Sequence, residues 1–170
     1  MTNNSFHVRP ATALDVRAIA GLRKPMEGDG RKLLKLELVQ LYERVPEFLV
    51  VTNSDGEIVG AGGLHIMWED LAEVRSVIVR EDVRGQGVGH LVVSALMDRA
   101  KTYGIKRVFC LTFETDFFSR HGFAEISDVP VDEETFAEMI RSNDDAVAEF
   151  LDLARVKENT LGNTRMLALL

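Results

Sequence analysis

The sequence is poor in cysteine and lacks long hydrophobic segments. It contains one cysteine, Cys110, which excludes an internal disulfide and a zinc site built from cysteines. Its longest unbroken apolar runs hold about five residues, against the roughly 20 that a membrane-spanning helix needs. Residues 1–8 lack the basic and apolar segments of a signal peptide. We therefore expect a cytoplasmic protein with no membrane partner.

Basic residues are also scarce. The 20 lysines and arginines are outnumbered by 27 aspartates and glutamates, for a net charge of −7, which disfavours a nucleic-acid partner. The length of 170 residues is typical of one domain, so we expect a single domain over residues 1–170, as a monomer or a homodimer. The histidines show no metal-ligand spacing, so we expect no metal: His7, His65, His90 and His121.

Apolar periodicity predicts a mixed α/β sheet whose elements do not alternate regularly. Strands are expected at 6–9, 48–52, 57–67, 73–79, 107–113 and 165–170. Helices are expected at 12–22, 33–44, 87–103, 117–121, 132–141 and 145–154. The strand over 107–113 is apolar, as is typical of a strand buried on both faces, and the strand over 73–79 is expected to be central.

The most distinctive local pattern is Arg84-Gly85-Gln86-Gly87-Val88-Gly89, between a predicted strand and an amphipathic helix. Glycines at a helix start let the backbone approach a ligand, and the N–H groups there attract anions. A dinucleotide-binding loop would need glycine where His90 stands, and a P-loop would need Gly-Lys-Ser/Thr, which the sequence lacks. The pattern therefore predicts another kind of anion site, or a tight turn without a ligand.

This loop resembles the Arg-x-x-Gly-x-Gly pyrophosphate-binding motif of the GNAT superfamily of N-acetyltransferases. The aromatic pair 117–118 and the Gly-Phe at 122–123 follow in the order of that superfamily. The resemblance implies the GNAT fold, a mixed and mostly antiparallel sheet with a splayed central parallel strand pair, flanked by helices. It implies acetyl-CoA as the co-substrate in that opening. The implied cofactor-binding residues are Val77, Ile78, Val79, Arg84, Gly85, Gln86, Gly87, Val88, Gly89, His90, Phe117 and Phe118.

Residues 71–76, 108–112 and 117–123 resemble a narrower group, the amino-acid N-acetyltransferases or N-acetylglutamate synthases. The closing segment 159–170 is similar to the end of that family, and the chain most resembles its short single-domain form from actinobacteria. The long form adds an amino-acid-kinase-like domain that binds arginine, which we do not expect here. The resemblance implies acetyl transfer to the α-amino group of L-glutamate, with L-glutamine as a second acceptor, in the first step of arginine biosynthesis.

Two other functions stay open. One is a GNAT enzyme of different specificity, which acetylates a protein N-terminus or an amine metabolite. The other is an acetyl-CoA sensor without turnover. Phe118 supports the sensor, because many superfamily members have a proton-donating tyrosine there, whereas Glu73 argues against it.

Two residues of the 73–79 strand are candidates for the chemistry. The resemblance makes Glu73 the candidate general base, because an α-amino group must lose its proton before it attacks. The alternative is a glutamate that only pairs at the surface. Arg75 is two positions on and so faces the same side of the strand. It either clamps a substrate carboxylate or forms an ion pair with Glu73.

The sequence also offers candidates for the proton donor and for further residues that bind the substrate carboxylates. The resemblance to the N-acetylglutamate synthases makes Thr112, near the end of its strand, the candidate acid in place of tyrosine; the alternative is a strand-end hydroxyl with no catalytic role. Lys157 and Arg165 are candidate substrate binders, and each alone also fits a solvated charge. Cys110 lies inside an apolar strand and is expected to be a packed core residue.

Overall fold

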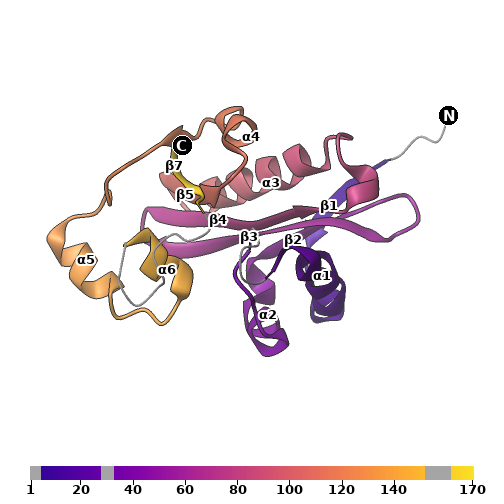
Figure 1. Ribbon diagram of the computed structural model, residues 1–170, viewed down its shortest axis with the longest axis horizontal. Coiled ribbons are helices and arrows are strands. Elements are labelled where there is room, and N and C mark those ends of the chain that lie inside the picture. The colour runs from indigo at the N-terminus through magenta and orange to yellow at the C-terminus, as the bar shows by residue number, and fades with distance from the viewer. Residues whose placement is uncertain (1–4, 28–32, 152–161) are drawn as a thin grey trace.

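The protein forms one seven-stranded sheet with helices on both faces, as the computed structural model of residues 5–27, 33–151 and 162–170 shows (Figure 1). The strand order is β1-β2-β3-β4-β5-β7-β6, and only the β4–β5 pair among these is parallel. The expected mostly antiparallel sheet with one parallel pair is confirmed. The strands are β1 (His7–Pro10), β2 (Phe48–Thr52), β3 (Ile58–Trp68), β4 (Leu71–Val79), β5 (Arg107–Thr112), β6 (Ala124–Glu125) and β7 (Thr164–Leu169).

The helices divide between the two faces of the sheet. α3 (Val88–Thr102) covers one face, and α1 (Val16–Arg23) and α2 (Leu38–Arg44) cover the other (Figure 1). α5 (Glu133–Met139) and α6 (Asp145–Phe150) lie at the end of the sheet away from α1. Among the residues that the structure describes, no helix has the length and apolar character needed to span a bilayer.

The parallel pair β4–β5 separates along its length, which opens the sheet at its centre. The two strands pair over only three positions, from Leu71↔Arg107 to Glu73↔Phe109. Beyond Glu73, β4 is irregular: its register against β3 shifts, and Ser76 has a φ of 56°, in the left-handed region. β5 instead continues in pairing with β7 up to Thr112. The expected splayed pair is therefore present.

The helix expected at 33–44 begins later, at Leu38. The preceding backbone is already engaged, because Arg23 donates to the Leu34 carbonyl and the Leu36 N–H donates to Glu27. The Glu37 N–H donates to the Gln40 side chain at 2.8 Å, which caps the helix at its observed start. Polar contacts with residues 9 and 11 positions earlier in the chain thus override the helical spacing of the leucines.

The other predicted elements are present with shifted ends. Asp132 caps α5 as expected, since its carboxylate accepts the N–H of Thr135 at 2.8 Å. The last predicted helix starts at Asp145, and its final expected residues, 152–154, lie outside the described part of the chain. The two-residue strand β6 was not predicted, because so short a strand shows no periodicity.

α3 packs closely on β3 because two glycines of that strand leave room for it. A Cβ at Gly62 would lie 2.5 Å from Val92 Cγ1 and 2.9 Å from Leu96 Cδ1. Val92 is β-branched and fully buried, so its methyl group has little freedom to move. The strand therefore needs glycine at this position to bring α3, and the loop before it, onto the sheet.

Gly62→Ala is expected to lower the free energy of unfolding by about 1–3 kcal/mol, the usual cost of overpacking a core. Urea denaturation monitored by circular dichroism measures this change. Gly21→Ala is the matched control, because a Cβ at this α1 position meets nothing within 4 Å. We expect the control to be neutral or stabilising, since alanine favours helix. A Gly62→Ala protein as stable as the wild type would contradict the close approach of α3.

Candidate active site

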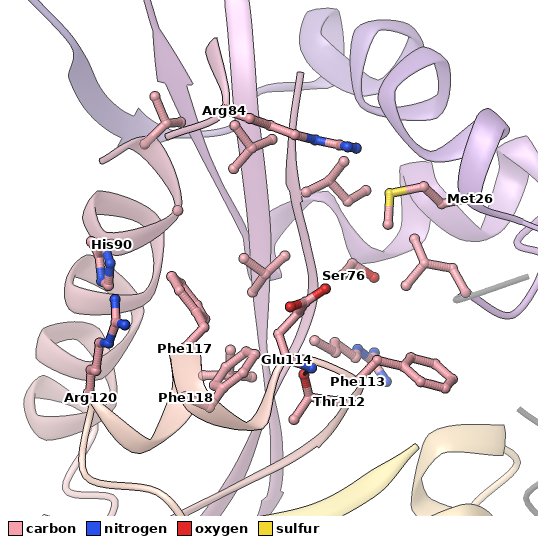
Figure 2. Close-up of a pocket in the computed structure, with 18 of the residues that line it drawn as sticks. Met26, Ser76, Arg84, His90, Thr112, Phe113, Glu114, Phe117, Phe118 and Arg120 are labelled. Carbon is pink, nitrogen blue, oxygen red and sulfur yellow. Dashed lines mark hydrogen bonds between the residues drawn. The ribbon is translucent and has the colours of Figure 1, made fainter. Parts of the chain in front are cut away.

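A pocket of about 600 Å³ occupies the opening between β4 and β5 (Figure 2). Its walls are residues 74–79 of β4, the turn into α3, residues 111–114 at the end of β5 and just beyond it, and α4 (Thr115–Ser119) with Arg120. All the expected cofactor-binding residues line it except Gln86, whose side chain donates to the Asp82 carbonyl at 3.4 Å. Met26, on the α1 side of the pocket (Figure 2), and Leu33 also line it, and sequence reasoning missed both.

The glycine loop presents the start of α3 to this pocket. Gly85 and Gly87 have φ angles of +78° and +86°, which explains the need for glycine at both positions. Gly87 is the N-cap residue of the 15-residue helix α3. The first N–H groups of a helix have no partner within the helix, and the helix dipole adds positive potential. The loop geometry can therefore bind a phosphate group of a cofactor.

Gly89 sets how closely α3 approaches the aromatic side of the pocket. A Cβ there would lie 3.3 Å from the Phe117 ring, so a larger residue would push the helix and α4 apart. Phe117 packs edge-to-face on Phe118, with ring centroids 5.1 Å apart. The aromatic pair thus forms an apolar wall opposite β4.

The buried arginine Arg23 supports the other wall of the pocket. It is 2% exposed and donates to Glu27 at 2.8 Å, to the Leu34 carbonyl at 2.9 Å and to the Ser76 hydroxyl. Burial lowers its pKa, although the charge of Glu27 opposes this. Arg23 therefore holds the irregular part of β4 against the end of α1. Sequence reasoning missed it, because Ser76 lies 53 residues away.

The candidate base and acid lie on the two strands that separate. Glu73 is 3% exposed at the last position of β4 that pairs with β5, and it is not among the residues that line the pocket. Thr112 lines the pocket, and its hydroxyl accepts the Glu114 N–H at 2.8 Å, which leaves the hydroxyl hydrogen for another acceptor. Cys110 is buried as expected, and burial, followed by the charge of Glu73, raises the pKa of its thiol.

Arg75 lies in a cluster of carboxylates beside Glu73. Its Nη1 donates to Asp144 Oδ1 at 3.0 Å, its Nη2 donates to Glu47 Oε2 at 2.8 Å, and Glu73 Oε2 lies 3.8 Å from Nη1. Burial alone would lower the pKa of Arg75, but the charges of these three carboxylates raise it. His65 adds a contact of 2.7 Å to Glu47.

This geometry bears on both expectations for Arg75. The contact with Glu73 is the expected ion pair, at long distance, and Arg75 also lines the pocket as a substrate clamp would. Two other protein carboxylates already occupy its guanidinium, so an acceptor carboxylate would have to share or replace them. Glu47 and Asp144 were not predicted, because they lie 28 and 69 residues from Arg75.

The structure describes one of the two remaining candidate substrate binders, and it lies outside the pocket. Arg165 is in β7, where its Nη2 donates to the Phe150 carbonyl at 3.1 Å, and it is not among the described residues that line the pocket. Lys157 lies outside the described residues. Both stay predictions.

The splayed parallel pair β4–β5, with a glycine loop at the start of α3, fits the class of acetyltransferases. The chain belongs to the acetyltransferase (GNAT) family, whose model matches residues 17–125. Within it, the chain is 50% identical to an amino-acid acetyltransferase of Mycobacterium tuberculosis over 165 residues, 96% of this chain and 94% of that protein. The amino-acid acetyltransferase of Pasteurella multocida is 33% identical over 131 residues, which is 75% of this chain but 29% of the relative.

Solved structures agree with this assignment. The crystal structure of Rv2747 from M. tuberculosis, in complex with CoA and NLQ, has a TM-score of 0.92 at 50% identity, over 96% of this chain and 99% of that chain. The N-acetylglutamate synthase of Neisseria gonorrhoeae, complexed with coenzyme A and N-acetyl-glutamate, has a TM-score of 0.76 at 22% identity, over 98% of this chain and 35% of that one. At 22% identity, the similarity to the N. gonorrhoeae enzyme supports the fold alone. The resemblance to the amino-acid N-acetyltransferases is confirmed.

Proposed function

We propose that this protein transfers the acetyl group of acetyl-CoA to the α-amino group of L-glutamate, with L-glutamine as a second acceptor, in the first step of arginine biosynthesis. The observation that carries the proposal is the pocket between β4 and β5, with its glycine loop, in a chain 50% identical to an amino-acid acetyltransferase over 96% of its length. The loop N–H groups would hold the pyrophosphate of acetyl-CoA. The backbone of residues 77–79 would hold its pantetheine arm.

The proposed chemistry is direct transfer between the two bound substrates. Glu73, directly or through a water molecule, takes a proton from the ammonium group of the acceptor. The free amine then attacks the thioester carbonyl carbon; the C–N bond forms, the nitrogen loses its second proton to solvent, and the C–S bond breaks. The thiolate of CoA leaves and takes up a proton, for which the Thr112 hydroxyl at the pocket wall is the proposed source, and Thr112 is reprotonated from solvent. No acyl-enzyme is needed, and the buried thiol of Cys110 has no role in it.

Further expectations belong to the same proposal. We expect one acetyltransferase domain over residues 1–170, a cytoplasmic location, and no nucleic-acid partner for a chain of net charge −7. A homodimer stays one of the two expected oligomeric states. Light scattering coupled to size-exclusion chromatography measures which of the two forms.

An acceptor scan tests the proposal. CoA release is followed with free amino acids, amines and peptides with a free N-terminus, each at saturating acetyl-CoA. We expect turnover with glutamate and glutamine. Turnover with peptides or other amines alone would leave an acetyltransferase of different specificity. Acetyl-CoA binding without turnover of any acceptor would support the acetyl-CoA sensor instead.

Arg75→Ala tests the proposed clamp on the acceptor carboxylate. A charged hydrogen bond is worth roughly 1.5–3 kcal/mol, so we expect the KM for glutamate to rise about tenfold or more, with the KM for acetyl-CoA barely changed. Arg75→Lys should restore only part of the effect, because an ammonium cannot reproduce the planar fork of a guanidinium. Steady-state kinetics with each substrate varied in turn measure both constants.

Arg107→Ala is the matched control for this arginine. Arg107 also donates to an aspartate, Asp70, at 2.9 Å, but it lies at the paired end of β5, away from the pocket. We expect its glutamate KM to equal that of the wild type. Unchanged glutamate kinetics in Arg75→Ala would mean that Arg75 serves the ion pairs only. Arg165 and Lys157 would then be the next candidates.

A further inference from the structure

Two imidazoles meet at the mouth of the pocket, and the acetyl-transfer chemistry uses neither of them. His90 Nδ1 lies 2.9 Å from His121 Nε2. His90 is in the first turn of α3 and lines the pocket. His121 follows α4 and is not among the described residues that line the pocket. The Phe117 ring packs against both, with centroids 4.7 Å from His90 and 5.2 Å from His121. Two rings from separate elements are thus held in a fixed contact.

The short contact limits the charge that this pair can hold. Only one hydrogen fits between the two facing nitrogens, so the pair carries at most one extra proton while the contact lasts. When His121 is the donor, neutral His90 keeps its hydrogen on Nε2. When His90 is the donor, its Nε2 bears a hydrogen only in the protonated ring. An anion at His90 Nε2 therefore accepts a hydrogen bond from the neutral pair only when His121 is the donor, but from the protonated pair whichever ring donates.

The charged groups around the pair favour an anion on the pocket side. Arg84 and Arg120 line the same pocket, and Figure 2 shows Arg120 with His90 on its α3 side. Among the described residues that line this pocket, Glu114 supplies the one carboxylate. Behind His121, Asp98 and Lys101 of α3 line a second groove together with residues 169–170 at the carboxyl end of the sequence.

Before an anion arrives, the surroundings of His121 favour its neutral form. Burial, followed by the neighbouring His90 ring, lowers the pKa of His121. The start of α3 adds positive potential, which also disfavours a cation there. A bound anion reverses both effects, because its charge stabilises the protonated ring.

We propose that the His90–His121 pair binds a phosphoryl group of acetyl-CoA and takes up a proton from solvent as it does so. The inference rests on the proposed function, which makes acetyl-CoA the ligand. A phosphoryl oxygen accepts the Nε2–H of His90 beside Arg120, and His121 shares the added proton across the contact of 2.9 Å. The group is the pyrophosphate or the 3′-phosphate of CoA. Since binding adds a proton, the affinity for acetyl-CoA rises as the pH falls from 8 toward 6.

Isothermal titration calorimetry tests this in pairs of phosphate-free buffers that differ in ionisation enthalpy, because the difference in heat counts the protons taken up. The wild type is compared with His90→Gln and His121→Gln. His7→Gln is the matched control, since His7 is exposed in β1 at the edge of the sheet. The 3′-phosphate titrates near pH 6 itself, at about the second pKa of a phosphate monoester. Only the difference between wild type and variant on the same ligand is therefore used.

We expect the wild type and His7→Gln to take up more protons on binding acetyl-CoA than His90→Gln does. Between pH 8 and pH 6, their affinity for acetyl-CoA should rise about tenfold more than that of His90→Gln. His121→Gln should lie between them, because the anion then meets His90 without the second ring that shares the added proton. Repeating the comparison with dephospho-acetyl-CoA separates the two sources. A difference that disappears assigns the 3′-phosphate, and one that persists assigns the pyrophosphate.

Two other results have distinct meanings. Proton uptake and pH dependence that are equal in the wild type and in both variants would overturn the role of the histidine pair, while leaving the acetyltransferase intact. A wild-type protein that does not bind acetyl-CoA at any pH would instead contradict the proposed function itself.

Discussion

Gly87→Glu is expected to abolish acetyl-CoA binding. Gly87 caps α3 with a φ of +86°, at the point where the proposed pyrophosphate site meets the helix. A glutamate there places a carboxylate beside two phosphates and occupies the space into which the N–H groups point. A Cβ at this position meets no protein atom within 4 Å, so the protein itself does not exclude the side chain. Calorimetry on the folded variant measures the loss.

The left-handed backbone at this position needs a control of its own, since a side chain there costs about 1–2 kcal/mol. Gly56→Glu supplies it. Gly56 has a φ of +78° in the turn between β2 and β3, and a Cβ there also meets nothing within 4 Å. We expect Gly56→Glu to lose comparable stability and to keep its acetyl-CoA affinity. Unchanged affinity in a folded Gly87→Glu protein would remove the loop from the cofactor site.

Glu73→Gln is expected to lower kcat by about 10²- to 10⁴-fold, the usual contribution of a general base. Glutamine keeps the shape of this buried side chain and removes its basicity. Acetyl-CoA affinity should change little, because Glu73 does not line the pocket. The remaining rate should rise about tenfold per pH unit while the acceptor is mostly protonated, since the free amine is then the limiting species. Steady-state kinetics over a pH series measure both effects.

Asp15→Asn controls for the loss of a buried carboxylate as such. Asp15 is 7% exposed, and its hydrogen bonds with Arg9 lower the pKa of its carboxyl to about 2. It lies before α1, and it is not a residue of the pocket. We expect this variant to lose stability and to keep its kcat. A Glu73→Gln enzyme that retains more than about half of the wild-type kcat would exclude Glu73 as the base.

Local features of the sequence were sufficient to predict most of the fold and one wall of the pocket. The central strand, the glycine loop and the long helix after it follow from periodicity and from glycine conformation, which depend on residues adjacent in the chain. The Asp132 cap and the apolar strand β5 were predicted for the same reason. The loop residues reach the pocket together because one strand-to-helix turn carries them all.

The partners of the charged side chains depend instead on how the chain folds back on itself. Arg23 meets Ser76 across 53 residues, and Arg75 meets Asp144 across 69. The residues next to an arginine in the sequence do not show whether its guanidinium is solvated, bound to substrate or bound to a carboxylate. A single charged side chain produces no periodic pattern that could reveal its partner. The late start of α2 follows from such contacts, and so does the carboxylate cluster beside Glu73. The tertiary fold decides these pairs, because a buried charge is costly without a partner and the topology determines which oppositely charged group lies within reach.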